Sequence, residues 1–210
     1  MQDILFDVNL GIVVATVLLS LYAWQKPQIF YGWMLNPPAV DRGQYFRFVT
    51  SGFIHADYMH LFFNMFTLYN FGGYIEQLMQ ARFGPEVGRA AYLLFYIVAI
   101  IASDIPSYLK NRGNPNYNSL GASGAVSAVV FGAILFFPTA QLLVFFIPMP
   151  AFIYAFLYLA YTYYEMRRGL GYVNHSAHWW GSIFGVIVMV ALYPDVVPHF
   201  ISEVSNWRPF

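Results

Sequence analysis

Three short polar clusters interrupt a largely apolar sequence, and they contain the residue types that acyl-transfer chemistry requires. Gly121-Ala122-Ser123-Gly124 supplies a hydroxyl, and His178 supplies an imidazole. His60 and Asn64 stand four residues apart, so a helix would carry both on one face. A serine becomes a nucleophile when a base takes its proton, and the resulting oxyanion needs hydrogen-bond donors. We therefore expect Ser123 to be the nucleophile and His178 its base. The expected oxyanion donors are His60, Asn64 and the backbone N–H of Ser123, which a helix start would leave unpaired.

The composition of the chain indicates a lipid environment for these groups. Of its 210 residues, 59% are hydrophobic and 10% are charged, whereas soluble domains are about one-quarter charged and roughly half apolar. The formal net charge is zero, which gives no reason to expect nucleic acid as a partner. Cysteine is absent, so disulfides, thiolate metal sites and a cysteine nucleophile are excluded.

The elements that must position the polar clusters are membrane-spanning helices. A hydrocarbon core about 30 Å thick needs about 20 mostly apolar residues per helix. Six segments fit this description: 8–24, 58–79, 88–109, 120–137, 141–164 and 177–193. The predicted fold is an all-α membrane protein in which residues 1–210 form a single domain, a bundle of six transmembrane helices. Residues 25–57 form a long first loop with many aromatic side chains, which we expect at the membrane interface.

The order of the spans brings the three clusters to the same side of the membrane. They stand at the starts of the second, fourth and sixth segments, and these starts share one face. His60, Ser123 and His178 each lie three to five residues beyond a loop residue, which is about 5–8 Å at 1.5 Å per residue. Contact between segments 120–137 and 177–193 requires their backbones to approach closely, which small residues permit in lipid. Gly124, Gly181 and Gly185 are such residues.

No carboxylate accompanies His178 in its own cluster. The next one along the chain, Asp195, is 17 residues further on, about 25 Å along a helix axis and hence at the opposite membrane face. We infer a Ser-His dyad in which packing orients the imidazole, and no cofactor is required. Zinc held by His60, His175 and His178 is the metal alternative. We expect no metal, because the His-Glu-x-x-His pattern of metalloproteases is missing.

Together, the clusters resemble those of rhomboid intramembrane serine proteases of the minimal six-span bacterial type. The resemblance covers residues 45–185 and rests on these motifs: His55, His60-Leu61-Phe62-Phe63-Asn64, Gly72-Gly73-Tyr74-Ile75-Glu76, Gly121-Ala122-Ser123-Gly124 and Ala177-His178-Trp179-Trp180-Gly181 continuing to Gly185. It implies that His60 and Asn64 lie on the oxyanion side and that Glu76 is a structural hydrogen-bonding residue. His55 either supports the site or makes a structural hydrogen bond, and Gly121, Gly124, Gly181 and Gly185 are supporting residues.

The sequence departs from the family pattern at Ser127, four residues after the expected nucleophile. Relatives usually carry an aromatic ring there that stacks on the catalytic histidine. Ser127 cannot stack, so either another aromatic residue, such as Trp179 or Trp180, holds His178 or the base is held more loosely. A second departure is Phe46-Arg47, where these proteases often carry a Trp-Arg pair.

The resemblance implies hydrolysis of peptide bonds in transmembrane protein substrates within the lipid bilayer. It also implies an integral, multi-pass protein of a bacterial inner (plasma) membrane. The alternative is a catalytically inactive rhomboid-like pseudoprotease that binds membrane-protein clients. The orientation stays open: the excess of Lys and Arg on the catalytic side predicts a cytoplasmic site, whereas the resemblance implies an external one.

Overall fold

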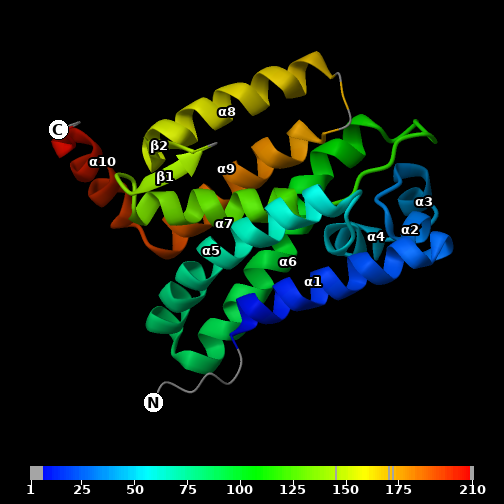
Figure 1. Cartoon of the computed structure of the whole chain (residues 1–210), viewed down its shortest axis with the longest axis horizontal. Coiled ribbons are helices and arrows are strands. Elements are labelled where there is room, and N and C mark those ends of the chain that lie inside the picture. The colour runs from blue at the N-terminus through cyan, green and yellow to red at the C-terminus, as the bar shows by residue number, and fades with distance from the viewer. Residues whose placement is uncertain (1–6, 145, 170, 172, 209–210) are drawn as a thin grey trace.

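The computed structural model describes residues 7–144, 146–169, 171 and 173–208, most of which are helical (Figure 1). Six long helices build the bundle: α1 (Val8–Gln25), α5 (Tyr58–Phe83), α6 (Pro85–Lys110), α7 (Ser123–Phe136), α8 (Ala151–Arg168) and α9 (His175–Leu192). Loop 1, between α1 and α5, is itself folded into α2 (Pro27–Trp33), α3 (Pro37–Asp41), α4 (Arg47–Thr50) and the 3-10 turn η1 (Ser51–Phe53). A hairpin of β1 (Gln141–Val144) and β2 (Ile147–Pro150) precedes α8, and α10 (Val196–Asn206) follows α9.

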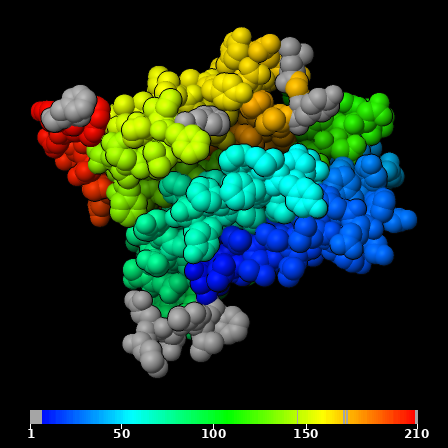
Figure 2. All heavy atoms as spheres, in the orientation of Figure 1, coloured from blue at the N-terminus to red at the C-terminus, as the bar shows by residue number. Residues whose placement is uncertain are grey.

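The central helix of the bundle is α7, which packs against α5, α6 and α9 (Figure 1). Every residue from Gly124 to Ile134 is buried, and a helix that is apolar on all sides belongs in the interior of a bundle. By contrast, α8 lies along the edge of the molecule (Figure 2), and only Ala151 and Thr162 among its described residues are buried. The nucleophile candidate therefore begins the most enclosed helix of the fold.

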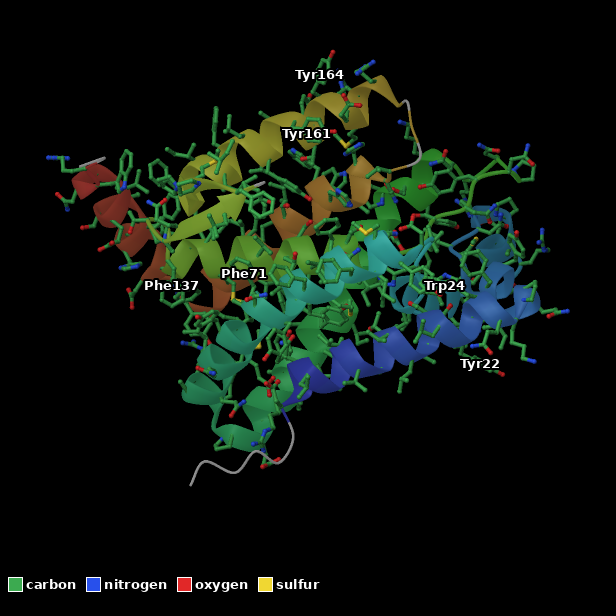
Figure 3. The ribbon with its side chains drawn as sticks, in the orientation of Figure 1. Tyr22, Trp24, Phe71, Phe137, Tyr161 and Tyr164 are labelled. Atoms are coloured by element: carbon green, nitrogen blue, oxygen red, sulfur yellow. The ribbon has the colours of Figure 1, made fainter. Side chains whose placement is uncertain are left out.

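The outer surface of the helices is apolar, as a membrane protein requires. Leu18, Leu94, Phe156 and Ile187 are each more than half exposed, and Figure 3 shows Tyr22 and Tyr164 projecting outward from α1 and α8. Such surfaces are unfavourable in water and compatible with lipid. By length and hydropathy α1, α6 and α9 can each cross a membrane, and α7 is a shorter apolar helix. The expected all-α membrane fold is confirmed, while the count of six spans stays a prediction.

The predicted helix over 141–164 is wrong at its beginning. Residues 141–144 and 147–150 pair as antiparallel strands, with Val144 opposite Ile147 and Gln141 opposite Pro150. Pro148 and Pro150 lack the N–H that a helix interior needs, and α8 begins directly after them. The hydropathy of this apolar segment is compatible with either a helix or a pair of strands, so hydropathy alone does not distinguish the two. The connection after α7 is correspondingly longer than expected, and α10 was not predicted.

Loop 1 is tied to the segment that leads into α7. Leu35 and Ser119 exchange two backbone hydrogen bonds of 2.9 and 3.0 Å. The N–H of Gly121 donates to the carbonyl of Ser51 over 2.9 Å. These bonds fix the chain immediately before Ser123 from the side of loop 1, so loop 1 is part of the scaffold of the site.

The start of α1 is held by one carboxylate on α5. Glu76 is buried and accepts hydrogen bonds from the N–H groups of Val8 over 3.1 Å and Asn9 over 2.9 Å. The Asn9 amide donates to the carbonyl of Leu68, and Tyr92 donates to the Asn9 side-chain oxygen over 2.7 Å. Glu76 is thus a structural hydrogen-bonding residue, as the resemblance implied.

We predict that Glu76→Ala lowers the free energy of unfolding by about 2–3 kcal/mol, because the buried N–H of Asn9 and the partly buried N–H of Val8 lose their acceptor. Glu86→Ala is the matched control, since Glu86 forms a surface ion pair with Arg89 and its side chain is 86% exposed; its effect should stay below about 1 kcal/mol. Thermal unfolding in detergent measures both. Equal losses of stability in the two variants would contradict the prediction.

Candidate active site

The structure brings the four expected catalytic and oxyanion residues into one cavity. This cavity has a volume of about 940 Å³ and is lined by His60, Asn64, Ser123 and His178. The residues come from the starts of α5, α7 and α9, three segments far apart in the sequence. The parity of the spans predicted this convergence, and the cavity lies at the end of the bundle where the loop before α7 meets loop 1.

Close contact between the backbones of α7 and α9 positions the two halves of the expected dyad. A Cβ on Gly181 would overlap the carbonyl oxygen of Gly124, and a Cβ on Gly185 would overlap that of Ala128. A Cβ on Gly124 would in turn overlap the Ser103 hydroxyl. These three positions admit no side chain, which is the close approach that the glycine spacing predicted. Ser123 directly precedes Gly124, and His178 lies one turn before Gly181, so this contact sets their separation.

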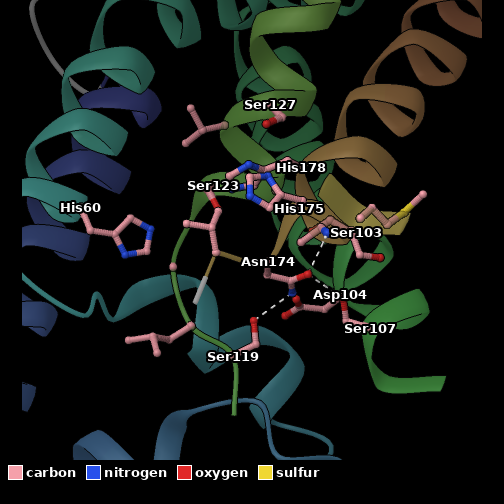
Figure 4. A pocket seen from close by; sticks show the side chains of 18 of the residues that line it. His60, Ser103, Asp104, Ser107, Ser119, Ser123, Ser127, Asn174, His175 and His178 are labelled. Atoms are coloured by element: carbon pink, nitrogen blue, oxygen red, sulfur yellow. Dashed lines mark hydrogen bonds between the residues drawn. The ribbon is translucent and has the colours of Figure 1, made fainter. Parts of the chain in front are cut away.

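Ser123 and His178 face each other across the cavity. Figure 4 shows the serine side chain pointing toward His178 and His175. Among the described residues no hydrogen bond joins the serine hydroxyl to the imidazole of His178. In enzymes without bound substrate such bonds are often long and tighten when the substrate is in place. The arrangement therefore places the expected nucleophile and the expected base in one cavity without a preformed bond between them.

His60 packs directly against the loop that leads into α7. Gly121 has φ +115°, and a Cβ built on it would lie 2.5 Å from the His60 ring. Both the left-handed backbone and this contact restrict the position to glycine. The His60 imidazole thus contacts Gly121, which is two residues before Ser123. It lies on the side of the cavity opposite to His178 (Figure 4).

Asn64 and the start of α7 provide N–H groups to the cavity. One N–H of the Asn64 amide donates to the His60 carbonyl over 2.9 Å, which leaves its second N–H available. At the start of α7, the N–H of Ser123 has no acceptor among the described residues. Unpaired N–H groups at a helix start favour a negative charge, so this wall can stabilise an oxyanion.

His55 is fully buried and forms a hydrogen bond with the residue that precedes Ser123. Its Nε2 accepts a hydrogen bond from the N–H of Ala122 over 3.3 Å, so its Nδ1 carries the proton and donates to the Ser20 hydroxyl over 3.1 Å. Ser20 donates onward to the carbonyl of Phe53 over 3.2 Å. Burial, followed by the neighbouring His60, lowers the pKa of His55 to about 3, against an opposing effect of Asp57. Of the two expected roles of His55, the structural hydrogen bond is present, and support of the site stays a prediction.

Asn174 joins three elements around the site, and the sequence analysis did not single it out. Its side-chain oxygen caps α9 by accepting from the N–H of Ala177 over 3.1 Å and also accepts from the Ser107 hydroxyl over 2.9 Å. Its amide donates to the Ser119 hydroxyl over 3.0 Å (Figure 4). An asparagine directly before an apolar helix is a capping signal, but its links to Ser107 and Ser119 depend on the tertiary fold.

Further polar residues lie near the site. Asp104, close to the end of α6, is buried, lines the cavity and accepts a hydrogen bond from the Ser51 hydroxyl over 3.1 Å. The His175 ring lies 5.8 Å from that of His178, whereas His199 is bonded to the Phe136 carbonyl at α10. Among the described residues, no three His, Cys, Asp or Glu side chains are arranged to hold a metal.

The ring that packs on His178 comes from α8. Tyr158 is nearly parallel to the imidazole, with 6.3 Å between ring centroids and 19° between planes. The suggestion of Trp179 or Trp180 was wrong, because Trp179 packs against Tyr163 and Trp180 against Trp179. Both tryptophans follow His178 directly, but neighbouring residues on a helix point in different directions.

Comparisons with known proteins agree with this architecture. Residues 42–195 match the family model described as Rhomboid domain. The chain is 30% identical to "RHOMBOID-like protein 12, mitochondrial" of Arabidopsis thaliana, over 86% of this chain and 57% of that protein. It is 26% identical to the human "Presenilin-associated rhomboid-like protein, mitochondrial", over 84% of this chain and 46% of that protein. It is 31% identical to the Bacillus subtilis "Putative rhomboid protease YdcA", over 46% of this chain and 43% of that protein. The chain thus spans about half the length of these relatives.

We predict that Gly181→Ala separates α7 from α9, lowers stability by about 1–3 kcal/mol and slows any reaction of Ser123 by at least about tenfold. Gly73→Ala on α5 is the matched control, because no atom lies within 4 Å of a Cβ at that position. Thermal unfolding and labelling of Ser123 by an activated phosphonate measure the two effects. Wild-type labelling in Gly181→Ala would argue against the close contact.

The neutral His55 predicts a pH-dependent contribution to stability. Since the pKa of His55 is about 3 in the folded protein and about 6.5 in an unfolded chain, the unfolded state binds more protons between these values. Stability supplied by His55 is therefore complete above pH 6.5 and is lost as the pH falls toward 3. Thermal unfolding at pH 7.0, 5.5 and 4.5 should show a steeper acid loss for wild type than for His55→Gln. Identical slopes would contradict the buried neutral imidazole.

Proposed function

This chain belongs to the rhomboid family, and from that membership we propose that it is an intramembrane serine protease with Ser123 and His178 as its catalytic dyad. The observation that carries the proposal is the meeting of Ser123, His178, His60 and Asn64 in one cavity. The chain is an integral membrane protein, so its substrates in this proposal are transmembrane segments of other proteins. The expected bacterial plasma membrane finds no support, because the relatives include plant and animal mitochondrial proteins as well as a bacterial one.

In the proposed reaction the Ser123 oxygen attacks a substrate carbonyl carbon while His178 takes the hydroxyl proton. The carbonyl oxygen becomes an oxyanion facing His60, the free N–H of Asn64 and the N–H of Ser123. His178 then returns its proton to the leaving amine as the peptide bond breaks. Water, deprotonated by His178, attacks the acyl-enzyme and releases the second product. No cofactor takes part in these steps.

The surroundings of the cavity suit such a reaction. A substrate helix has its peptide groups hydrogen-bonded internally, so a stretch of it must unwind before attack. Unwound peptide groups then need polar partners, and Ser103, Ser107 and Asn174 line the same cavity as the dyad. These side chains, together with Asp104, can also hold water for the second step within an otherwise apolar bundle.

The alternative is a rhomboid-like protein that binds membrane-protein clients without cleaving them. Two observations favour it: the named mitochondrial relatives carry the description rhomboid-like, and no hydrogen bond joins Ser123 to His178. Binding alone, however, does not require a serine, a histidine and unpaired N–H groups around one cavity. The protease is therefore the function that the site supports best.

We predict that a fluorophosphonate probe labels the wild-type protein and that Ser123→Ala abolishes labelling. His178→Ala should reduce both the labelling rate and the cleavage of a fluorogenic transmembrane peptide by at least about 1,000-fold. Ser176→Ala serves as the matched control, because it removes another hydroxyl near the start of α9 and should label like wild type. A folded wild-type protein that binds the peptide but neither reacts with the probe nor cleaves would instead identify a client-binding protein.

A further inference from the structure

Tyr158 connects three functional parts of the molecule through one side chain. Its hydroxyl lies 3.1 Å from the Ser127 hydroxyl on α7, and its ring packs nearly parallel to the His178 ring on α9. The ring also contacts Phe131, with 5.6 Å between centroids. The residue itself belongs to α8 and lines the cavity. One side chain of the outer helix thus contacts both helices of the proposed dyad.

The two contacts of Tyr158 are geometrically related. Ser127 stands one helical turn after Ser123 and so faces the same side of α7. A hydrogen bond between the Ser127 and Tyr158 hydroxyls holds the far end of the ring. The ring plane is then fixed against the imidazole, at 19° from parallel. Ser127 has no aromatic ring, but its hydroxyl binds the hydroxyl of the Tyr158 ring from α8.

The imidazole of His178 has few other means of orientation. No carboxylate accompanies it, and its hydrogen bonds with Asn174 and Ser182 involve its backbone N–H and carbonyl, not its ring. The described residues provide no hydrogen-bond partner for the ring nitrogens of His178. Packing must therefore set the ring angle, and His175 and Tyr158 are the rings beside it.

The helix that carries Tyr158 is held less firmly than its neighbours. Only Ala151 and Thr162 of its described residues are buried, and Thr162 donates within its own helix. Its outer side exposes Phe156, Leu157 and Tyr164. If α8 moves away from α7, the Ser127–Tyr158 bond breaks and the ring leaves the imidazole in the same step.

We propose that Tyr158 is the positioning residue for His178, so that the base is aligned only while α8 is docked against α7. This role in catalysis rests on the proposed function, in which His178 is the base. It assigns to the outer helix a direct part in the alignment of the base, through a ring supplied from α8 in place of one at position 127. A structural role alone would require Tyr158 only to fill space between the helices.

The test compares Tyr158→Leu, Tyr158→Phe and the double variant Ser127→Tyr/Tyr158→Leu, which moves the ring from α8 to α7. Tyr164→Leu is the matched control, because Tyr164 is 59% exposed on the outer side of the same helix. For each variant we would measure thermal unfolding in detergent, the phosphonate labelling rate, and kcat and KM for a fluorogenic transmembrane peptide. The ring-current shift of the His178 Cε1–H proton, assigned with His178→Ala, reports the stacking without any need for activity.

We expect Tyr158→Leu to lower kcat and labelling by about 10–100-fold with little change in KM, because the base is misplaced. Tyr158→Phe keeps the ring, so its kcat and labelling rate should fall by less than about fivefold. The loss of one hydrogen bond between hydroxyls sets this upper bound. The double variant should regain at least about tenfold over Tyr158→Leu and restore the ring-current shift, whereas Tyr164→Leu should match wild type.

Two results would overturn the inference while leaving the proposed function intact. One is a folded Tyr158→Leu protein that labels at the wild-type rate. The other is a folded double variant that regains the ring-current shift but no activity. If wild type itself fails to react with the probe, the proposed function fails. The ring-current shift of His178 then decides whether Tyr158 orients that ring. A shift that is the same in Tyr158→Leu as in wild type would overturn the inference.

Discussion

The contact between the backbones of α7 and α9 is the constraint on which the rest of the site depends. Gly124 and Gly181 meet with no room for a side chain, and Ala128 and Gly185 repeat the contact one turn further along. Helices with larger residues at these positions would stand farther apart and carry Ser123 away from His178. In lipid, where the hydrophobic effect does not draw helices together, small residues make such packing possible. The glycines thus fix the distance between the two helices that carry Ser123 and His178.

Polar side chains around this contact hold the surrounding backbone in place. His55 fixes Ala122, the residue before Ser123, and Asn174 caps α9 while donating to Ser119, which leads into α7. Each of these polar groups is buried or partly buried and hydrogen-bonded, because unpaired polar groups are costly in an apolar bundle. Among the described residues, the Ser123 N–H and one N–H of Asn64 have no acceptor, and both residues line the cavity. Both donors are therefore available where the proposed oxyanion would form.

Sequence alone predicted the parts of this arrangement that follow from regular spacing. The meeting of Ser123, His178 and His60 follows from span parity, and the close helices follow from Gly124, Gly181 and Gly185. The pairing of residues 141–144 with 147–150 does not follow from hydropathy, because Val144 and Ile147 are equally apolar in a strand and in a helix. Pro148 and Pro150 are the residues that disfavour a helix there. Tyr158 was missed for a different reason: it is 31 residues from Ser127, and no local pattern indicates which of several tyrosines on α8 will face inward.

The proposed function requires Ser123 and the unpaired N–H groups to act on one carbonyl group. The Ser123 oxygen bonds to its carbon, and the N–H groups donate to its oxygen. An experimental structure of the phosphonate-inhibited protein in a lipid environment tests this requirement most directly. The account predicts phosphorus bonded to the Ser123 oxygen, with a phosphonyl oxygen within about 3 Å of the Ser123 N–H and the Asn64 amide. An adduct on another residue, or a phosphonyl oxygen directed away from these donors, would contradict it.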